Sequence, residues 1–163
     1  MRKGQHIRCF DYVNHRYAQV RDSLKANPLA VFQHATTSAA ARAHAVASHL
    51  HANIAGLDVG KEVEIVAGPL EESTMGPSSS PVTRLHLEWK ASESAGLFPT
   101  MHADLSVYPL TATETQLDFS GHYEPPLGPL GTAVDALMGH RIAEASVHRF
   151  VSDVANHLRK ALV

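Results

Sequence analysis

The sequence lacks several features that large classes of protein require: paired cysteines, long apolar runs and a signal sequence. It has a single cysteine, Cys9, so no disulfide can form within the chain, which fits a reducing compartment. No run approaches the roughly 20 apolar residues that a membrane-spanning helix needs. The start, MRKGQHIRCF, has no apolar stretch behind its basic residues, as a secretion signal would. We therefore expect a soluble cytoplasmic protein with no membrane insertion.

An excess of charge of one sign is also missing. The 14 Lys and Arg residues nearly balance 16 Asp and Glu residues, for a net charge of −2. Nucleic acids require a concentrated basic face, so no nucleic-acid partner is expected. Gly128 and Gly131 match no nucleotide-binding loop, and the serines of GPSSSP lack the strand–turn–helix setting of a hydrolase nucleophile. We expect no cofactor.

The first part of the chain predicts a strand and two short helices. At 163 residues and 44% apolar composition, the chain fits one domain, residues 1–163, with a substantial core. Residues 6–13 (HIRCFDYV) are rich in aromatic and β-branched residues, which favours a strand. Residues 14–24 predict a short helix capped by Asn14, and residues 27–43 predict a second, with proline at its first position.

From His44 onward the apolar residues alternate with polar ones, which is typical of an antiparallel sheet with one solvated face. The alternation occurs in five segments: SHLHANIAG (48–56), EVEIVAG (62–68), RLHLEWK (84–90), HADLSVYP (102–109) and QLDFSGHY (116–123). Residues 73–81 and 91–99 predict connecting loops of hairpin type, and residues 111–115 predict a tighter turn. Together with the first strand, we expect about six to seven strands.

The chain closes with a long amphipathic helix, predicted over residues 130–162. Its apolar residues recur at steps of three and four, and its charged residues lie on the opposite face of the helix. Burying this stripe against the apolar face of the sheet is the favourable arrangement. A strongly twisted sheet cannot lie flush along a straight helix, so an apolar space is expected between them. That space is a candidate ligand pocket.

This order of elements resembles the helix-grip fold of the START and polyketide cyclase/dehydrase superfamily (SRPBCC), which includes the birch pollen allergen. The resemblance covers nearly the whole chain. Residues 12–24 (YVNHRYAQVRDSL) look like the superfamily's strand-to-helix entry, and residues 123–158 look like the last strand, proline/glycine ramp and gripping helix of its bacterial members. The superfamily has no catalytic signature shared by all members, so the resemblance implies an α+β helix-grip fold and transfers no catalytic residue.

Three functions are compatible with this pattern. The first is binding of a small hydrophobic molecule, such as a lipid, polyketide or isoprenoid, between the sheet and the last helix. The second is a cyclase, aromatase or dehydratase that uses the same cavity. The third is a ligand-free interaction protein, as a monomer or homodimer. The expected cavity-lining residues are Leu87, Trp89, Leu105, Phe119, Tyr123, Met138, Ile142 and Phe150.

Histidine is unusually frequent, with 12 copies. His49 and His51 are expected on one strand, and His102 falls opposite His122, with Glu88 beside them, if the last hairpin turns at residues 111–115. Imidazoles on neighbouring strands could bind a transition metal. The spacings match no closed or catalytic metal site, so we interpret these residues as a solvated outer face and expect no metal.

Single polar residues are interpreted mainly as structural. Among the tyrosines, Tyr123 is the best candidate for a phenol that orients a ligand, because alternation places it on the face of Phe119. Cys9 is expected to be a small buried filler with no histidine assigned to it as a base. His140, His148 and His157 are expected at solvated or rim positions of the last helix.

Overall fold

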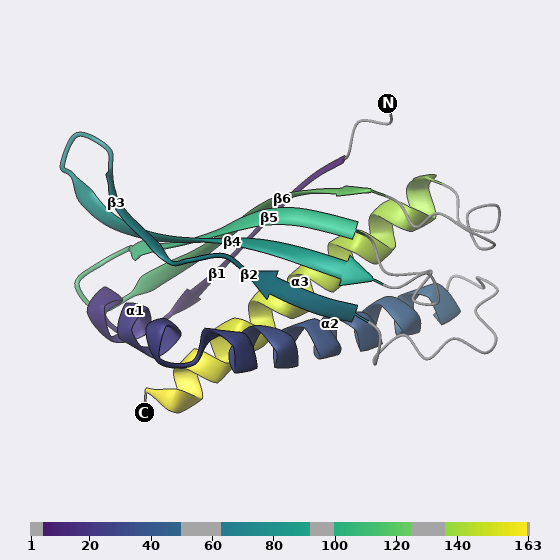
Figure 1. Cartoon of the computed structure of the whole chain (residues 1–163), viewed down its shortest axis with the longest axis horizontal. Coiled ribbons are helices and arrows are strands. Elements are labelled where there is room, and N and C mark those ends of the chain that lie inside the picture. The colour runs from purple at the N-terminus through teal and green to yellow at the C-terminus, as the bar shows by residue number, and fades with distance from the viewer. Residues whose placement is uncertain (1–4, 50–62, 92–99, 125–135, 163) are drawn as a thin grey trace.

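The computed structural model describes residues 5–49, 63–91, 100–124 and 136–162 (Figure 1). Two helices follow the first strand, five strands come next, and a long helix closes the chain. In chain order the elements are β1 (Gln5–Val13), α1 (Tyr17–Ala26), α2 (Pro28–His49), β2 (Val63–Ala67), β3 (Glu71–Met75), β4 (Ser80–Ala91), β5 (Thr100–Pro109), β6 (Thr115–Glu124) and α3 (Ala136–Ala161).

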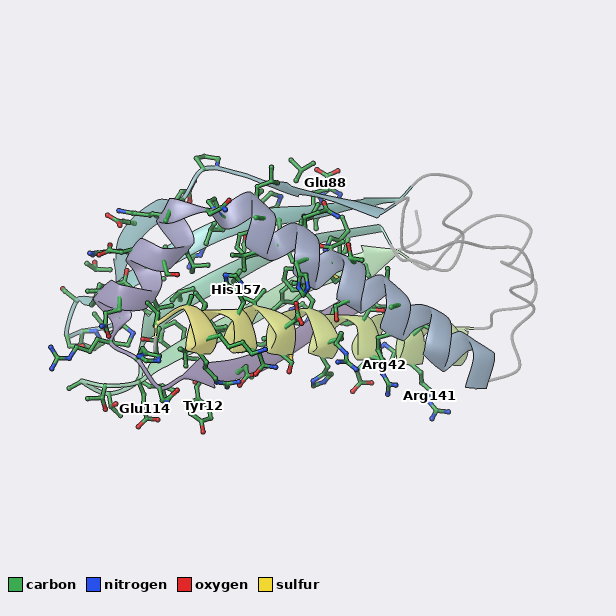
Figure 2. The ribbon with its side chains drawn as sticks, turned by 90° about the horizontal axis from the view of Figure 1, so that it is seen from below. Tyr12, Arg42, Glu88, Glu114, Arg141 and His157 are labelled. Carbon is green, nitrogen blue, oxygen red and sulfur yellow. The ribbon has the colours of Figure 1, made fainter. Side chains whose placement is uncertain are left out.

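The strands form one antiparallel sheet that curves over α2 and α3. The strand order is β1-β6-β5-β4-β2. The short strand β3 pairs with the first residues of β4, and β2 pairs with its last residues. Seen from the helix side, α2 and α3 lie side by side along the concave face of the sheet (Figure 2). This is the predicted α+β architecture, with a sheet that wraps around a long C-terminal helix.

The core lies between the concave face and the two long helices. Alternate residues of β4, β5 and β6 are buried there, and the apolar stripe of α3 faces them. Each fully buried Leu, Val, Ile or Phe side chain contributes about 1.5–3 kcal/mol by leaving water. Among the described residues, no helix combines the length and apolarity needed to cross a membrane.

The second helix is longer than predicted. We expected it to be short and to end near Ala43, with a strand over residues 48–56, but α2 has 22 residues and includes His49. Alanine has the highest helix propensity, and its small side chain carries little periodic signal that separates a helix from a strand. The rest of that expected strand, including His51, lies outside the described residues.

The segment predicted as the first loop is mostly a hairpin. Residues 73–75 belong to β3, which pairs with the start of β4, and the turn between them has Gly76 at φ 75° and Ser79 at φ 52°. All five side chains of β3 are exposed, so no buried face marks it as a strand in the sequence. The turn predicted at 111–115 is confirmed, whereas residues 92–99 and the expected helical residues 130–135 lie outside the described part.

Candidate functional site

The residues predicted to line a cavity converge between the sheet and α3. Seven of the eight side chains are described, and each of the seven is at most 2% exposed: Leu87, Trp89, Leu105, Phe119, Tyr123, Ile142 and Phe150. Strand alternation and helical spacing turn all of them inward. Met138 belongs to α3, but its side chain lies outside the described part. The sequence therefore identified residues that share one interface.

Aromatic rings fill the middle of this interface. The ring of Trp89 meets Phe150 edge-on, with centroids 5.2 Å apart, and Phe119 lies 5.8 Å from Phe150. Phe32 of α2 stacks on Phe150 at 6.1 Å. These distances are those of favourable aromatic packing. This part of the interface is a filled core, so the role of these residues as the wall of a ligand cavity stays a prediction.

A polar cluster around the buried Tyr123 lies where β1 begins, β6 ends and α3 begins. The hydroxyl of Tyr123 donates to Oε1 of Gln5 at 2.7 Å and lies 2.8 Å from Nδ1 of His140. A phenol has one proton, so in this arrangement His140 donates Nδ1–H to the Tyr123 oxygen. Tyr123 is only 1% exposed, and these two hydrogen bonds replace the water that its hydroxyl loses.

His140 connects this buried phenol to the surface. Its Nε2 atom lies 3.9 Å from the carboxylate of Glu144, one helical turn further along α3. Burial raises the pKa of Tyr123, and the negative charge of Glu144 raises it further. Tyr123 is therefore protonated at neutral pH. A carboxylate, an imidazole and a phenol thus form a chain in which Tyr123 can donate a proton and is a poor base.

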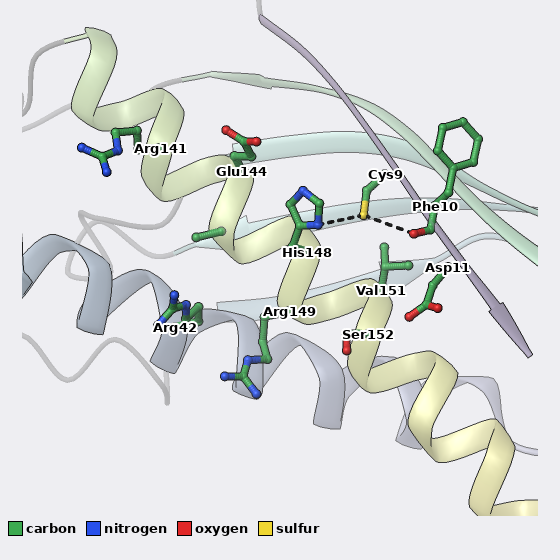
Figure 3. A pocket seen from close by; sticks show the side chains of 11 residues that line it. Cys9, Phe10, Asp11, Arg42, Arg141, Glu144, His148, Arg149, Val151 and Ser152 are labelled. Carbon is green, nitrogen blue, oxygen red and sulfur yellow. Dashed lines mark hydrogen bonds between the residues drawn. The ribbon is translucent and has the colours of Figure 1, made fainter.

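An open pocket of about 850 Å³ lies on the solvent-facing side of α3, between β1 and α2 (Figure 3). This volume is in the range of small-molecule sites. Side chains from all three elements line it: Cys9, Phe10, Asp11, Arg42, Arg141, Glu144, Ala145, His148, Arg149, Val151 and Ser152. None of the predicted cavity residues is in this set. The pocket is thus separate from the aromatic core.

Sequence reasoning missed this pocket. Arg141, Glu144, His148 and Ser152 recur at steps of three and four, which places them on one helix face, and that recurrence was the only available signal. We interpreted that face as solvated. Nothing in the sequence brings Arg42 beside it, because that depends on how two helices about 100 residues apart pack together.

Comparisons with known proteins support the fold. No family model matches the chain, and no curated protein matches its sequence. The solved structure of the Zhui aromatase/cyclase from Streptomyces sp. R1128 is similar, with 12% identity, a TM-score of 0.50, and coverage of 98% of this chain and 96% of that one. A conserved protein from Geobacillus kaustophilus has 12% identity, a TM-score of 0.48, and coverage of 96% and 97%.

The chain therefore shares its overall fold, a curved antiparallel sheet around a long C-terminal helix, with the solved aromatase/cyclase. The resemblance inferred from residues 12–24 and 123–158 is therefore confirmed at the level of the fold. In this helix-grip domain, the buried Tyr123 cluster lies between the sheet and the gripping helix α3. The arginine-containing pocket lies on the opposite, solvent-facing side of the same helix.

Cys9 of the helix-grip domain has a histidine partner, contrary to our expectation. Its Sγ atom lies 3.4 Å from Nδ1 of His148. Burial raises the pKa of the Cys9 thiol to about 11, and the negative charge of Asp11 adds to this shift. The thiol is therefore protonated at neutral pH, and the carbonyl oxygen of Phe10, 3.9 Å from Sγ, is a further acceptor for its proton. Since the thiolate is the nucleophilic form, this pair is not an activated nucleophile.

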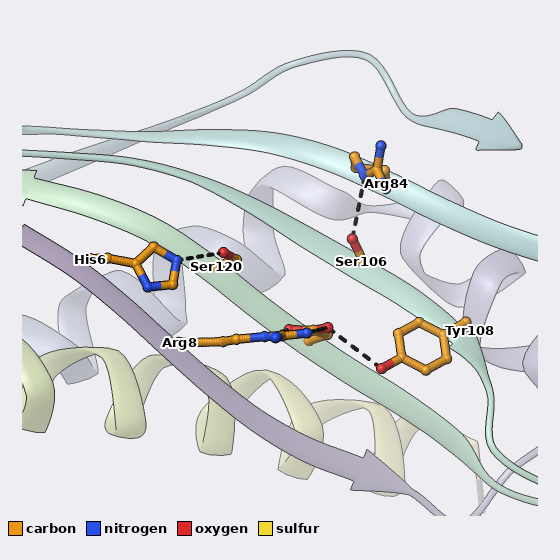
Figure 4. Close-up of polar contacts among 7 residues, drawn as sticks. His6, Arg8, Arg84, Ser106, Tyr108 and Ser120 are labelled. Carbon is orange, nitrogen blue, oxygen red and sulfur yellow. Dashed lines mark hydrogen bonds and ion pairs between the residues drawn. The ribbon is translucent and has the colours of Figure 1, made fainter. Parts of the chain in front are cut away.

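The outer face of the helix-grip sheet carries a row of histidines. His102 is paired with His122, as predicted, and His6 and Glu88 continue the row on the neighbouring strands. His6 also hydrogen-bonds to Ser120 at 3.0 Å (Figure 4). Within the described ranges, no group of three or more His, Cys, Asp or Glu side chains could hold a metal ion.

Proposed function

We propose that the protein binds a small, largely apolar organic molecule between the sheet and α3, on the Tyr123 side of the aromatic core. The observation that carries this proposal is the hydrogen bond between the buried Tyr123 and the partly exposed His140, at the edge of an otherwise apolar interface. Apolar walls supply affinity at about 25 cal/mol per Å² buried, and one or two polar groups orient the ligand. The fold shared with an aromatase/cyclase supports the proposal.

The packing supports a ligand position at one end of the interface. Trp89, Phe119 and Phe150 occupy the middle of the interface, so the ligand lies beyond them, near the end of β6. There it meets a phenol whose raised pKa keeps its proton in place. A ligand carbonyl or hydroxyl oxygen takes the place of Gln5 Oε1 as the acceptor of the one phenol proton. The ligand class supported best is therefore an apolar molecule that carries at least one such oxygen.

A second candidate is a cyclase or dehydratase that uses the same space. The observation in its favour is the chain from Glu144 through His140 to Tyr123. In this alternative Tyr123 donates its proton to a substrate oxygen, His140 passes its Nδ1 proton to the phenolate, and Nε2 of His140 takes up a proton from water, so the imidazole stays neutral. Holding a flexible substrate in a reactive shape supplies the rest of the catalysis. The solved relative is called an aromatase/cyclase, which agrees with this alternative.

Native mass spectrometry of freshly purified protein, followed by titration with an aromatic ketone, tests the proposal. We expect a co-purified mass of lipid or polyketide size, or saturable binding of the ketone. Tyr123→Phe removes the donor and should weaken ketone binding about five- to tenfold, the value of one buried hydrogen bond. Tyr108→Phe is the matched control, because its hydroxyl lies on the outer face near Asp118 and should leave binding unchanged.

The results separate the candidate functions. Turnover of an aromatic polyketide analogue that is lost in Tyr123→Phe would assign the enzyme function. Binding without turnover would assign the carrier function. A protein with no co-purified mass, no ketone binding and no response to apolar fluorescent probes would refute both and leave a ligand-free interaction protein. Equal ketone affinity in Tyr123→Phe and the unmodified protein would refute the role of this residue.

A further inference from the structure

The pocket on the outer side of α3 is lined by three arginines from two helices. Arg42 belongs to α2, and Arg141 and Arg149 belong to α3. Figure 2 shows Arg42 and Arg141 on the helix side of the molecule, and Figure 3 shows all three around the pocket. All three are exposed, and within the described part of the chain none of their guanidinium groups pairs with a carboxylate. Three positive charges thus face one concavity.

The two carboxylates that line the pocket have cationic or imidazole neighbours of their own. Asp11 accepts a hydrogen bond from Arg159 at 3.0 Å, and Arg159 is not among the lining residues. Glu144 lies 3.9 Å from Nε2 of His140. The Cys9 thiol is protonated and adds no negative charge. Three arginines face two carboxylates, one of which is paired with Arg159, so the lining keeps a net positive charge and the pocket favours an anion.

The rest of the lining suits an organic body attached to that anion. Ala145 and Val151 supply apolar surface to the lining, whereas the ring of Phe10 points away from the pocket and lies against the Arg8 guanidinium (Figure 3). The His148 imidazole, whose Nδ1 atom lies 3.4 Å from Sγ of Cys9, adds a polar group to the lining. The volume of about 850 Å³ is far larger than a bare phosphate or carboxylate group needs.

We propose that this pocket is a second binding site, which holds a small organic molecule by a carboxylate or phosphate group. Arg42, Arg141 and Arg149 bind the oxyanion, because guanidinium groups match the geometry of both groups with paired hydrogen bonds. Ala145 and Val151 contact the organic part. This site lies on the opposite side of α3 from Tyr123, and Glu144 is the residue that the two sites share.

Three probes and four variants test the proposal. Phenyl phosphate, benzoate and the neutral benzyl alcohol are titrated at low ionic strength, with calorimetry for affinity and the His148 imidazole NMR signal for location. The variants are Arg42→Gln, Arg141→Gln, Arg149→Gln and, as the matched control, Arg84→Gln. Arg84 lies on the outer face of the sheet, beside Ser106. All four side chains are exposed, so folding should be unaffected.

We expect at least one of the two anions to bind and to shift the His148 signal, while benzyl alcohol does not. Each pocket variant should weaken binding about three- to tenfold, as expected for loss of a charge-assisted hydrogen bond at an exposed site. Arg84→Gln should match the unmodified protein, and added salt should weaken binding. The anion that binds with the higher affinity identifies the class of oxyanion, phosphate or carboxylate.

Three results would overturn the proposal: no binding of either anion at millimolar concentration, equal binding of benzyl alcohol, or anion affinity that none of the three pocket variants reduces. The interior proposal is tested separately, since Tyr123→Phe leaves all three arginines in place. Loss of ketone binding in that variant with unchanged anion binding would show that the two sites are distinct.

Discussion

Burial decides the chemistry of Cys9. Its side chain is 4% exposed and its thiol contacts an imidazole, an arrangement that elsewhere activates a nucleophile. Here the loss of water dominates and raises the pKa, with the charge of Asp11 acting in the same direction. A nucleophilic role would need the opposite shift. Cys9 is thus a weak hydrogen-bond donor that fixes one wall of the outer pocket.

The raised pKa of Cys9 predicts a loss of stability at alkaline pH. In the unfolded chain the thiol ionises near pH 9.0, and in the folded protein near pH 11. Below pH 9 both states hold the proton, and between these values the unfolded chain loses it first. The unfolding free energy should therefore fall as pH rises from 9 to 11, by on the order of 2 kcal/mol from this group.

Urea denaturation at pH 8 to 11 measures this effect, with Cys9→Ala as the control. The phenols of Tyr108 and Tyr123 also have raised pKa values, so some alkaline loss remains in the variant. The difference between the two pH profiles isolates the thiol. Parallel profiles for the two proteins would contradict the assigned shift.

At the scale of elements, the strands β5 and β6 lie close together at one pair of small residues. Gly121 of β6 is paired with Ala103 of β5 on the concave face. A Cβ atom added at Gly121 would lie 2.8 Å from the Cβ of Ala103 and 3.0 Å from the carbonyl oxygen of His102. Both neighbours belong to or adjoin the backbone of a central strand, which cannot move away freely. The glycine is therefore required by packing.

We predict that Gly121→Ala lowers the unfolding free energy by about 1–3 kcal/mol, the usual cost of overpacking a core. Gly68→Ala is the matched control, because the nearest atom to its added Cβ is the carbonyl oxygen of His86 at 3.5 Å, an ordinary contact. It should change stability by less than about 0.5 kcal/mol. Urea denaturation measures the stability of both variants. Equal midpoints for Gly121→Ala and Gly68→Ala would show that the sheet adjusts to the added methyl group without loss of stability.

At the scale of the whole molecule, sheet and helices share one core, so we propose that the chain unfolds as a single domain. Trp89 is the only tryptophan and packs against Phe119 and Phe150, so its fluorescence reports the contact between sheet and α3. Circular dichroism reports the helices themselves. We predict coincident urea transitions by the two signals. Loss of the Trp89 signal before the helical signal would show that α3 leaves the sheet as a separate step.

The fold was largely predictable because its strongest signals are periodic. Alternation marked β4, β5 and β6, and the three-and-four spacing marked α3. Prediction was wrong where no such signal exists. The alanine-rich end of α2 has side chains too small to show a period, and β3 has no buried face. Of the candidate sites, Tyr123 was predicted, whereas its partners Gln5 and His140 were not.

The sequence by itself determined which side chains leave water, because alternation and helical spacing assign each apolar residue to one face without reference to the rest of the chain. Only the tertiary structure decided which polar groups meet. His140 reaches Tyr123, His148 reaches Cys9 and Arg42 lines a pocket with Arg149 through contacts between distant segments. Such contacts depend on how the helices cross the sheet and one another, and that geometry results from the packing of the whole core.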